Sequence, residues 1–253
     1  MHNVLNFYGR VALVTGGSQG IGKEVVEQLL MGGAKVYFWS LTPSRLEAAL
    51  YHFQQVFDAR QVKAAVVDVR SEIQVDEGVK QVEDVFGGID ILVNNAGVFG
   101  PAKSVLEYSV EEWQAVFDSN VLSQFLVSRA VVPGMMQRGY GRVVNMSSAV
   151  AKDGNPLANA YSSSKAAIMR FTQCLAREVA KTGVVVTAVA PSAARTALFD
   201  GVRQEVIDIM LKKVPMSRFA TVSEIAALVC WLASEDNSFS TGSTFDICGG
   251  RIG

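Results

Sequence analysis

The stretch "RVALVTGGSQGIG", residues 10–22, decides the fold. Its first half is an apolar run, which predicts a buried strand, and glycines then stand at positions 16, 20 and 22. Glycine permits a tight turn and a close backbone approach, while the free N–H groups and positive dipole end of a following helix attract anions. After the first strand of an alternating α/β chain, such a turn indicates a dinucleotide site. Its candidate binding residues are Gly16, Ser18, Gln19, Gly20, Ile21 and Gly22.

Short apolar runs alternate with helical patterns along the rest of the chain. Strands are predicted at residues 10–15, 35–39, 63–67, 89–93, 141–146, 184–190 and 244–247. Helical spacing of apolar residues follows the first strand and fills residues 71–86, 104–137, 161–181 and 222–234. Strand and helix in this order build a parallel sheet covered on both faces, with ligands at the carboxyl ends of its strands. We therefore predict one α/β domain over residues 1–253, of the Rossmann-type doubly wound class with a seven-stranded parallel sheet.

Composition and charge narrow the class of partner. The chain has 253 residues, 49% of them hydrophobic, and its 24 acidic and 23 basic residues nearly cancel. The sequence has no basic stripe that would attract nucleic acid or an anionic membrane. Small molecules are therefore the favoured class of partner. No uncharged apolar run approaches the roughly 20 residues of a bilayer span, and "MHNVLNFYGR" lacks the pattern of a leader peptide. We expect a cytoplasmic protein with no membrane or nucleic-acid partner.

The cysteines and histidines argue against several kinds of site. Cys174, Cys230 and Cys248 are far apart and odd in number, which suits a reducing compartment. The two histidines, His2 and His52, are too few for a histidine-rich zinc site or a hydrolase triad, so we expect no metal. A hydrolase that used a serine would also lack a GxSxG turn here.

Four motifs follow one another in a characteristic order. They are TGxxxGIG from residue 15, "NNAG" at 94–97, Ser148 in "NMSSA", and Tyr161 with Lys165 in "AYSSSKAAIMR". In their order and spacing they resemble the short-chain dehydrogenase/reductase family, with a 3-oxoacyl-acyl-carrier-protein-reductase-like pattern, over nearly the whole chain. The resemblance implies an NAD(P)(H)-dependent oxidoreductase that interconverts a small-molecule secondary alcohol and a ketone. The alternative is a catalytically inactive Rossmann nucleotide-binding regulator.

Tyr161 and Lys165 are the predicted proton-transfer pair. Oxidation of an alcohol removes a proton from oxygen, and a phenol with a pKa of about 10 must shift by about 3 units, roughly 4 kcal/mol, to accept it near neutrality. Lys165 at i+4 shares a helix face with Tyr161, and its cation favours the phenolate. We predict that Tyr161 is the general acid/base. The resemblance implies that Lys165 also bonds the nicotinamide ribose.

Two further side chains complete the predicted catalytic group. Ser148 stands 13 residues before Tyr161, the separation that the family uses. It would hold the substrate oxygen while negative charge develops there, and Ser147 is the adjacent alternative. Asn120, in "VFDSNVL", matches the family's helix asparagine, which implies a supporting role in a proton relay through Lys165.

The end of the second predicted strand, "FWSLTPSR", bears on the choice of coenzyme. NAD enzymes generally keep an acid there, whereas this chain has Ser40, which does not repel a 2′-phosphate. We predict NADP(H) in preference to NAD(H), with Ser40, Leu41 and Thr42 near the adenosine ribose, although the usual basic partners are missing. The other coenzyme residues implied by the resemblance are Asp68, Val69, Asn95, Ala96, Gly97, Tyr161, Lys165, Pro191, Ala194 and Thr196.

The substrate is expected between two segments near the catalytic residues. A helical lip at about 192–216 would cover it and contribute Leu198. On the other side we place Val150 and Asn155, together with Ser148 and Tyr161. The helical segments 104–137 and 161–181 carry more apolar surface than one sheet needs, and the resemblance implies that they pair between subunits in a homotetramer, a dimer of dimers.

Overall fold

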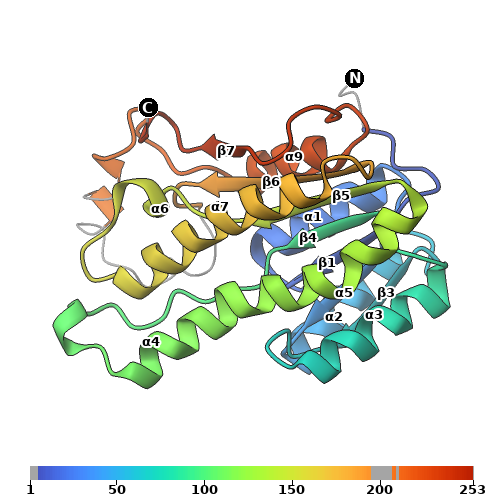
Figure 1. Ribbon diagram of the computed structural model, residues 1–253, viewed down its shortest axis with the longest axis horizontal. Coiled ribbons are helices and arrows are strands. Elements are labelled where there is room, and N and C mark those ends of the chain that lie inside the picture. Colours follow the sequence, from blue (N-terminus) through green and yellow to red (C-terminus); the bar gives the residue numbers. More distant parts are fainter. Residues whose placement is uncertain (1–4, 195–206, 209–210, 253) are drawn as a thin grey trace.

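The computed structural model describes residues 5–194, 207–208 and 211–252 (Figure 1). Its strands are β1 (Val11–Thr15), β2 (Lys35–Ser40), β3 (Val62–Val66), β4 (Ile91–Asn94), β5 (Gly141–Met146), β6 (Val184–Pro191) and β7 (Thr244–Ile247). Its helices are α1 (Gly20–Met31), α2 (Pro43–Val56), α3 (Glu72–Phe86), α4 (Val110–Phe117), α5 (Ser123–Arg138), α6 (Val150–Asp153), α7 (Asn159–Val179) and α9 (Val222–Ala233), with helical turns η1 (Val105–Glu107) and η2 (Asp118–Leu122). Among the helices so described, none combines the length and hydropathy of a membrane span.

The strands form one seven-stranded sheet in the order β3-β2-β1-β4-β5-β6-β7. Every neighbouring pair is parallel; Val14 of β1, for example, lies beside Phe38 of β2 and Val93 of β4. The predicted doubly wound Rossmann-type fold is therefore confirmed. Because strand order reverses at β1, the carboxyl ends of β1 and β4 diverge there and leave room for a ligand.

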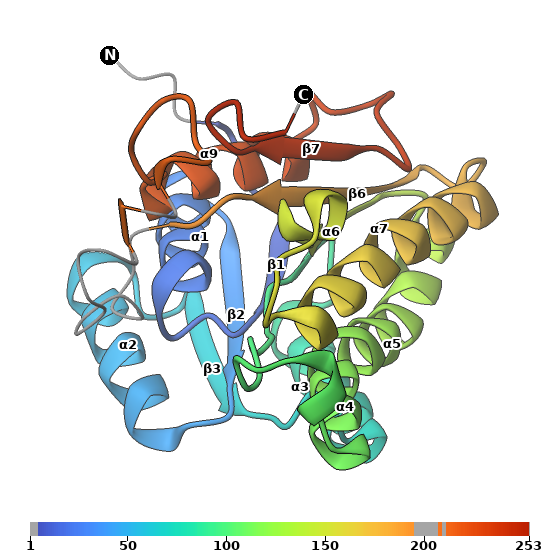
Figure 2. The same ribbon diagram turned by 90° about the vertical axis from the view of Figure 1, so that its left-hand side faces the viewer.

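Helices cover both faces of the sheet. Figure 2 shows α1, α2 and α9 on one side and α3, α5 and α7 on the other. Side chains along β1 alternate between the two cores, since Ala12 and Val14 pack with the first group and Val11 and Leu13 with the second. Burial on both faces explains why the strands read as continuous apolar runs.

The predicted helix over residues 104–137 is wrong in its first part. Ser104 and Ser109 each begin a separate helical turn, because each hydroxyl accepts a backbone N–H while Glu107 or Glu112 bonds back to the serine N–H. Two such capping boxes in succession start α4 only at Val110. The helix then passes through η2, a π turn, before α5.

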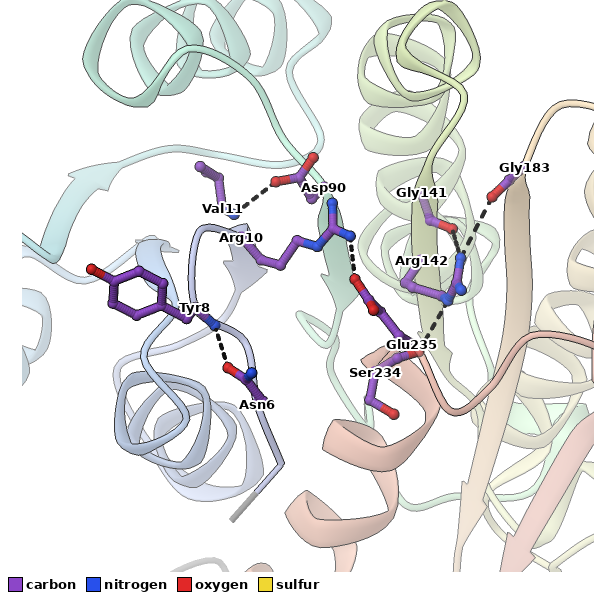
Figure 3. A network of polar contacts seen from close by, with 10 residues as sticks. All are labelled: Asn6, Tyr8, Arg10, Val11, Asp90, Gly141, Arg142, Gly183, Ser234 and Glu235. Atoms are coloured by element: carbon purple, nitrogen blue, oxygen red, sulfur yellow. Dashed lines mark hydrogen bonds and ion pairs between the residues drawn. The ribbon is translucent and has the colours of Figure 1, made fainter.

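A charged network closes the edge of the sheet at the amino ends of its strands (Figure 3). The buried guanidinium of Arg142 donates to the carbonyl oxygens of Ser234 at 3.1 Å and Gly141 at 3.0 Å. Arg10 pairs with Glu235, and the Arg10 and Arg142 guanidinium carbons lie 3.7 and 4.7 Å from the centroid of the Tyr140 ring. These contacts tie β1, β5 and the end of α9 together, which leaves the carboxyl edge of the sheet for ligands.

Candidate active site

The turn between β1 and α1 is shaped by its glycines. Gly16 and Gly20 have φ values of +67° and +55°, in the left-handed region that favours glycine. A Cβ on Gly22 would stand 2.3 Å from the Gly16 carbonyl oxygen and 2.4 Å from Nδ2 of Asn95, so no larger residue fits. Gln19, the N-cap of α1, makes no side-chain capping bond. The first N–H groups of α1 therefore face outward without a side-chain cap, which is an arrangement that suits an anion such as the predicted pyrophosphate.

The "NNAG" segment after β4 is fastened to this turn. The Thr15 hydroxyl accepts the N–H groups of Asn95 and Ala96, both at 3.0 Å. In return, Nδ2 of Asn95 donates to the carbonyl oxygens of Thr15 at 3.0 Å and Gly16 at 3.2 Å. Thr15 was not among the predicted site residues, although it opens the glycine motif. The four bonds set the backbone of residues 95–97 beside the glycine turn.

The end of β2 presents hydroxyl groups. The Ser40 hydroxyl lies 2.8 Å from that of Ser18, and the Thr42 N–H donates to it at 3.4 Å. Leu41 is exposed, and Thr42 is the N-cap of α2 without a side-chain capping bond. The predicted residues 40–42 thus meet the glycine turn, with the amino end of α2 open toward an anion.

Asp68, one of the predicted coenzyme residues, follows β3 and forms an ion pair with a neighbouring arginine. Arg70 forms a two-pronged ion pair with its carboxylate, with Nη2 2.7 Å from Oδ2. This hydrogen bond lowers the pKa of Asp68 below its usual value. The adjacent Val69 is half-buried and packs against the core on the α3 face.

Ser148, Tyr161 and Lys165 come together at the end of β5 and the start of α7. The Ser148 hydroxyl faces that of Tyr161 and donates to the Pro191 carbonyl at 3.5 Å. The Lys165 ammonium stands 5.7 Å from the centroid of the Tyr161 ring and donates to the Met146 carbonyl at 2.8 Å. The two predicted proton carriers therefore lie on the same side of α7.

The structure separates the two candidate serines. The Ser147 hydroxyl donates to the Lys165 carbonyl oxygen at 2.7 Å. It therefore bonds to α7 itself, whereas Ser148 faces the Tyr161 hydroxyl. Of the two, only Ser148 stands where it could hold a substrate oxygen beside Tyr161.

Burial governs the electrostatics of this group. It raises the pKa of Tyr161 above its usual value, and the hydrogen bond from Ser148 acts in the opposite, weaker direction. It also lowers the pKa of Lys165 to about 8, so the lysine is still a cation at pH 7. The shift at Tyr161 is opposite to the one expected from Lys165 alone, because the charged form of a buried phenol loses its hydration.

Asn120 occupies the π turn η2 and is fully buried. Its Oδ1 accepts the Val98 N–H at 2.7 Å, and its Nδ2 donates to the Val98 carbonyl at 2.9 Å and to the Ser164 hydroxyl at 2.9 Å. Asn120 thus joins the loop after β4 to the helix that carries Tyr161 and Lys165. Gly97 in that loop permits the contact, since a Cβ there would stand 2.8 Å from Oδ1 of Asn120.

The expected substrate side carries one residue that sequence reasoning missed. The Phe99 ring lies 4.9 Å from that of Tyr161 at an interplanar angle of 37° and is 43% exposed. Its signal was an aromatic residue two positions after "NNAG". Val150 is buried at the start of α6, and Asn155 is half-buried in the loop that follows.

The end of β6 is described as far as Ala194. The Pro191 carbonyl accepts the Ala149 N–H at 2.9 Å, so β6 closes on the turn that bears Ser148. Ser192, which follows Pro191, has a negative φ, so a residue with a side chain fits this turn without strain. Ala194 is buried and bridges to Ala220. Thr196 and Leu198, and most of the predicted lip, lie outside the described residues.

Comparisons with known proteins agree with this geometry. The sequence matches the family described as short chain dehydrogenase over residues 10–207. It is 41% identical to 2-dehydro-3-deoxy-L-rhamnonate dehydrogenase (NAD(+)) from Sphingomonas sp. strain SKA58, over 97% of this chain and 96% of that protein. It is 36% identical to a 3-oxoacyl-[acyl-carrier-protein] reductase of Vibrio cholerae, over 97% and 98%. A crystal structure from Agrobacterium tumefaciens, of a protein proposed to be a gluconate dehydrogenase, superposes with a TM-score of 0.93 at 28% identity and covers 98% of both chains.

Proposed function

Because this chain belongs to the short-chain dehydrogenase/reductase family, we propose that Ser148, Tyr161 and Lys165 carry out the oxidoreduction that the family performs. The chain is an NAD(P)-dependent oxidoreductase acting on CH–OH groups. The observation that supports the assignment is one hydroxyl pair, Ser148 with Tyr161, beside the ammonium of Lys165. Asn120 supports the group through its bonds to Val98 and Ser164.

The proposed roles follow from what each side chain can hold or move. Ser148 donates a hydrogen bond to the substrate oxygen and keeps it next to the Tyr161 hydroxyl. In oxidation the alcohol proton passes to the Tyr161 phenolate, and in reduction the phenol returns a proton to the carbonyl oxygen. Lys165 stabilises the phenolate as a neighbouring cation. The bound nicotinamide would accept or supply the hydride, and the positive charge of its oxidised form would add to this stabilisation.

Replacement of Tyr161 tests the proposal. We expect Tyr161→Phe to lower kcat by about 10³-fold or more while coenzyme affinity stays within about twofold, because only the proton carrier is removed. Tyr51→Phe, at an exposed tyrosine on α2, is the matched control and should keep full activity. The assay follows reduced-nicotinamide absorbance with a panel of alcohols and ketones. Unchanged turnover in the Tyr161→Phe enzyme would overturn the mechanism; coenzyme binding without turnover in either protein would instead favour the inactive regulator.

We propose NADP(H) as the preferred coenzyme. Support comes from Ser40, whose hydroxyl replaces the carboxylate that would repel a 2′-phosphate, and from the open amino end of α2 next to it. The relative from Sphingomonas is named for NAD(+), so both coenzymes belong in the test. Titration of protein fluorescence with NADPH and NADH measures the preference, and tighter binding of NADH would reverse it.

The substrate panel takes its members from the names of the relatives. Sugar-acid alcohols and their keto forms come first, because the 41% identical relative acts on 2-dehydro-3-deoxy-L-rhamnonate. Acyl thioesters and steroids follow, after the reductase from Vibrio cholerae and a 3α-hydroxysteroid dehydrogenase from Mediterraneibacter gnavus that is 33% identical.

The proposal of a reducing, cytoplasmic compartment rests on the three cysteines, all of which are unpaired.

We also propose a homotetramer. Leu122, Phe125 and Met136 recur at helical spacing along η2 and α5, and they are 37%, 41% and 40% exposed. These three residues, which we call the apolar stripe of α5, are interrupted by Arg129, whose guanidinium lies 5.2 Å from the centroid of the Phe125 ring; exposed apolar side chains on a long helix favour burial against a second copy of the chain.

A further inference from the structure

The segment after β7, Cys248–Ile252, which we call the tail, is held against α6. The Arg251 guanidinium makes a two-pronged ion pair with the Asp153 carboxylate, with Nε 2.7 Å from Oδ2 and Nη2 3.1 Å from Oδ1. The Arg251 side chain is only 9% exposed, and that of Asp153 is 31% exposed. A bidentate pair with so little solvent contact is stronger and more specific in geometry than an ordinary surface pair.

A second ion pair joins the same elements. Lys152, next to Asp153 on α6, lies 2.6 Å from Oδ2 of Asp246 on β7. Two oppositely charged residues of α6 are therefore matched by two of the β7 and tail region. Figure 1 shows α6 beside the segment that leads to the C-terminal end of the chain.

α6 is in turn continuous with the turn that bears Ser148. The Ser148 carbonyl accepts the Ala151 N–H at 3.1 Å, and Gly154 N–H bonds back to Val150 at 3.0 Å. Residues 148–154 thus form one small hydrogen-bonded unit. A displacement of α6 would act on Ser148 through its carbonyl, while the Ala149 N–H stays bonded to Pro191 of β6.

The tail also contacts residues 214–216, on the far side from α6. The Gly249 carbonyl accepts the Met216 N–H at 3.1 Å. Gly249 has a φ of +59°, and a Cβ there would stand 2.7 Å from Val214, so the two segments are in close contact. The tail is therefore common to α6 and to residues 214–216, where the predicted substrate lip ends.

We propose that Arg251 is a positioning residue: through Asp153 it fixes α6, and so sets the Ser148 hydroxyl relative to Tyr161 for the substrate oxygen. This inference rests on the proposed roles of Ser148 and Tyr161. Loss of Asp153 would leave the Arg251 guanidinium, which is only 9% exposed, without its partner, and loss of Arg251 would free α6 from the tail; in either case α6 would shift or loosen. The consequence belongs to substrate alignment, because the glycine turn that suits the coenzyme makes none of these contacts.

The kinetic test compares two ion pairs of the same kind. We expect Arg251→Gln and Asp153→Asn each to lower kcat/KM for the carbonyl substrate by roughly fivefold or more, with coenzyme Kd unchanged. Arg60→Gln is the control, because Arg60 makes a similar two-pronged pair with Asp58 on an exposed loop before β3. The exchanged double variant, Arg251→Asp with Asp153→Arg, should recover part of the loss. Equal losses in substrate and coenzyme parameters, or no loss in either single variant, would overturn the proposal.

A second measurement does not need turnover. Amide hydrogen exchange of residues 148–156 should become at least about threefold faster in Arg251→Gln, while exchange in α1 stays as in the parent protein. Faster exchange without a catalytic effect would mean that the Arg251–Asp153 ion pair does hold α6 but that the assigned role of Ser148 is wrong. Unchanged exchange would show that the Arg251–Asp153 ion pair does not hold α6, whatever the enzyme's activity.

Discussion

At the scale of single residues, Lys165 carries a buried charge that lowers the stability of the folded protein. Its ammonium is buried and has a pKa lowered to about 8. An unfolded lysine titrates near 10.5, so keeping the folded one charged at pH 7 costs about 3 kcal/mol. The Met146 carbonyl, which accepts from the ammonium at 2.8 Å, gives the buried charge one hydrogen-bond partner. In the proposed mechanism this cation stabilises the Tyr161 phenolate.

Replacement by an apolar side chain of similar length should therefore stabilise the protein and inactivate it. We expect Lys165→Met to raise the free energy of unfolding by about 1–3 kcal/mol at pH 7, without coenzyme. The gain should shrink as pH rises from 8 to about 10.5, because the folded wild-type lysine loses its proton in that window while the unfolded one keeps it. Urea unfolding at pH 7 and pH 10 measures both effects. A Lys165→Met protein that is less stable than the parent at pH 7 would contradict this account.

At the scale of elements, a chain of buried polar side chains links two strands to two helices. Nδ2 of Asn94 on β4 donates to the Ser128 hydroxyl of α5 at 3.1 Å and to Oδ1 of Asn145 on β5 at 2.9 Å. Nδ2 of Asn145 donates in turn to the Thr172 hydroxyl of α7 at 3.0 Å. The chain holds α7, which bears Tyr161 and Lys165, in register with the centre of the sheet.

Interrupting this hydrogen-bonded chain of side chains should destabilise the fold. We expect Asn145→Leu to lower the free energy of unfolding by about 2–4 kcal/mol, because the Asn94 amide and the Thr172 hydroxyl lose a buried partner. Thr187→Val on the adjacent strand is the control: its hydroxyl makes one long bond of 3.5 Å, so it should cost less than about 1 kcal/mol. Urea unfolding of the two variants measures both free energies. Equal losses of unfolding free energy would show that this hydrogen-bonded chain of side chains stabilises the fold no more than one isolated hydroxyl does.

At the scale of the whole molecule, the same sheet serves two purposes at its opposite edges. Its amino edge is closed by the Arg10 and Arg142 network, and its carboxyl edge bears the candidate site. One face of α5 packs on the sheet through Leu126 and Val127, while its apolar stripe through Phe125 remains exposed. That stripe is the surface through which we expect copies of the chain to associate.

Light scattering after size exclusion tests the assembly. We expect a particle of about four times the 27.2 kDa of one chain. The double variant L122E/F125E should reduce it to dimers or monomers, because four or more buried charges would face each other at the interface. Y51E, at an exposed tyrosine on α2, controls for added charge. A monomeric parent protein would refute the tetramer.

Local patterns predicted most of this fold. The seven strands were expected within two residues of their bounds, since apolar runs and glycine turns act over short stretches. The start of α4 was missed, although the capping boxes at Ser104 and Ser109 were written in the sequence. Phe99 was missed because its place beside Tyr161 depends on the path of a loop.

By itself the sequence determined the order of elements, the need for glycine at position 22, and the pairing of Tyr161 with Lys165. Each of these depends on backbone geometry within one turn or on the period of one element. Only the tertiary structure decided that Ser148 rather than Ser147 meets Tyr161, that burial raises the Tyr161 pKa, and that Arg251 clamps Asp153. Those outcomes depend on desolvation and on contacts between segments far apart in the chain, which exist only once the sheet has brought them together.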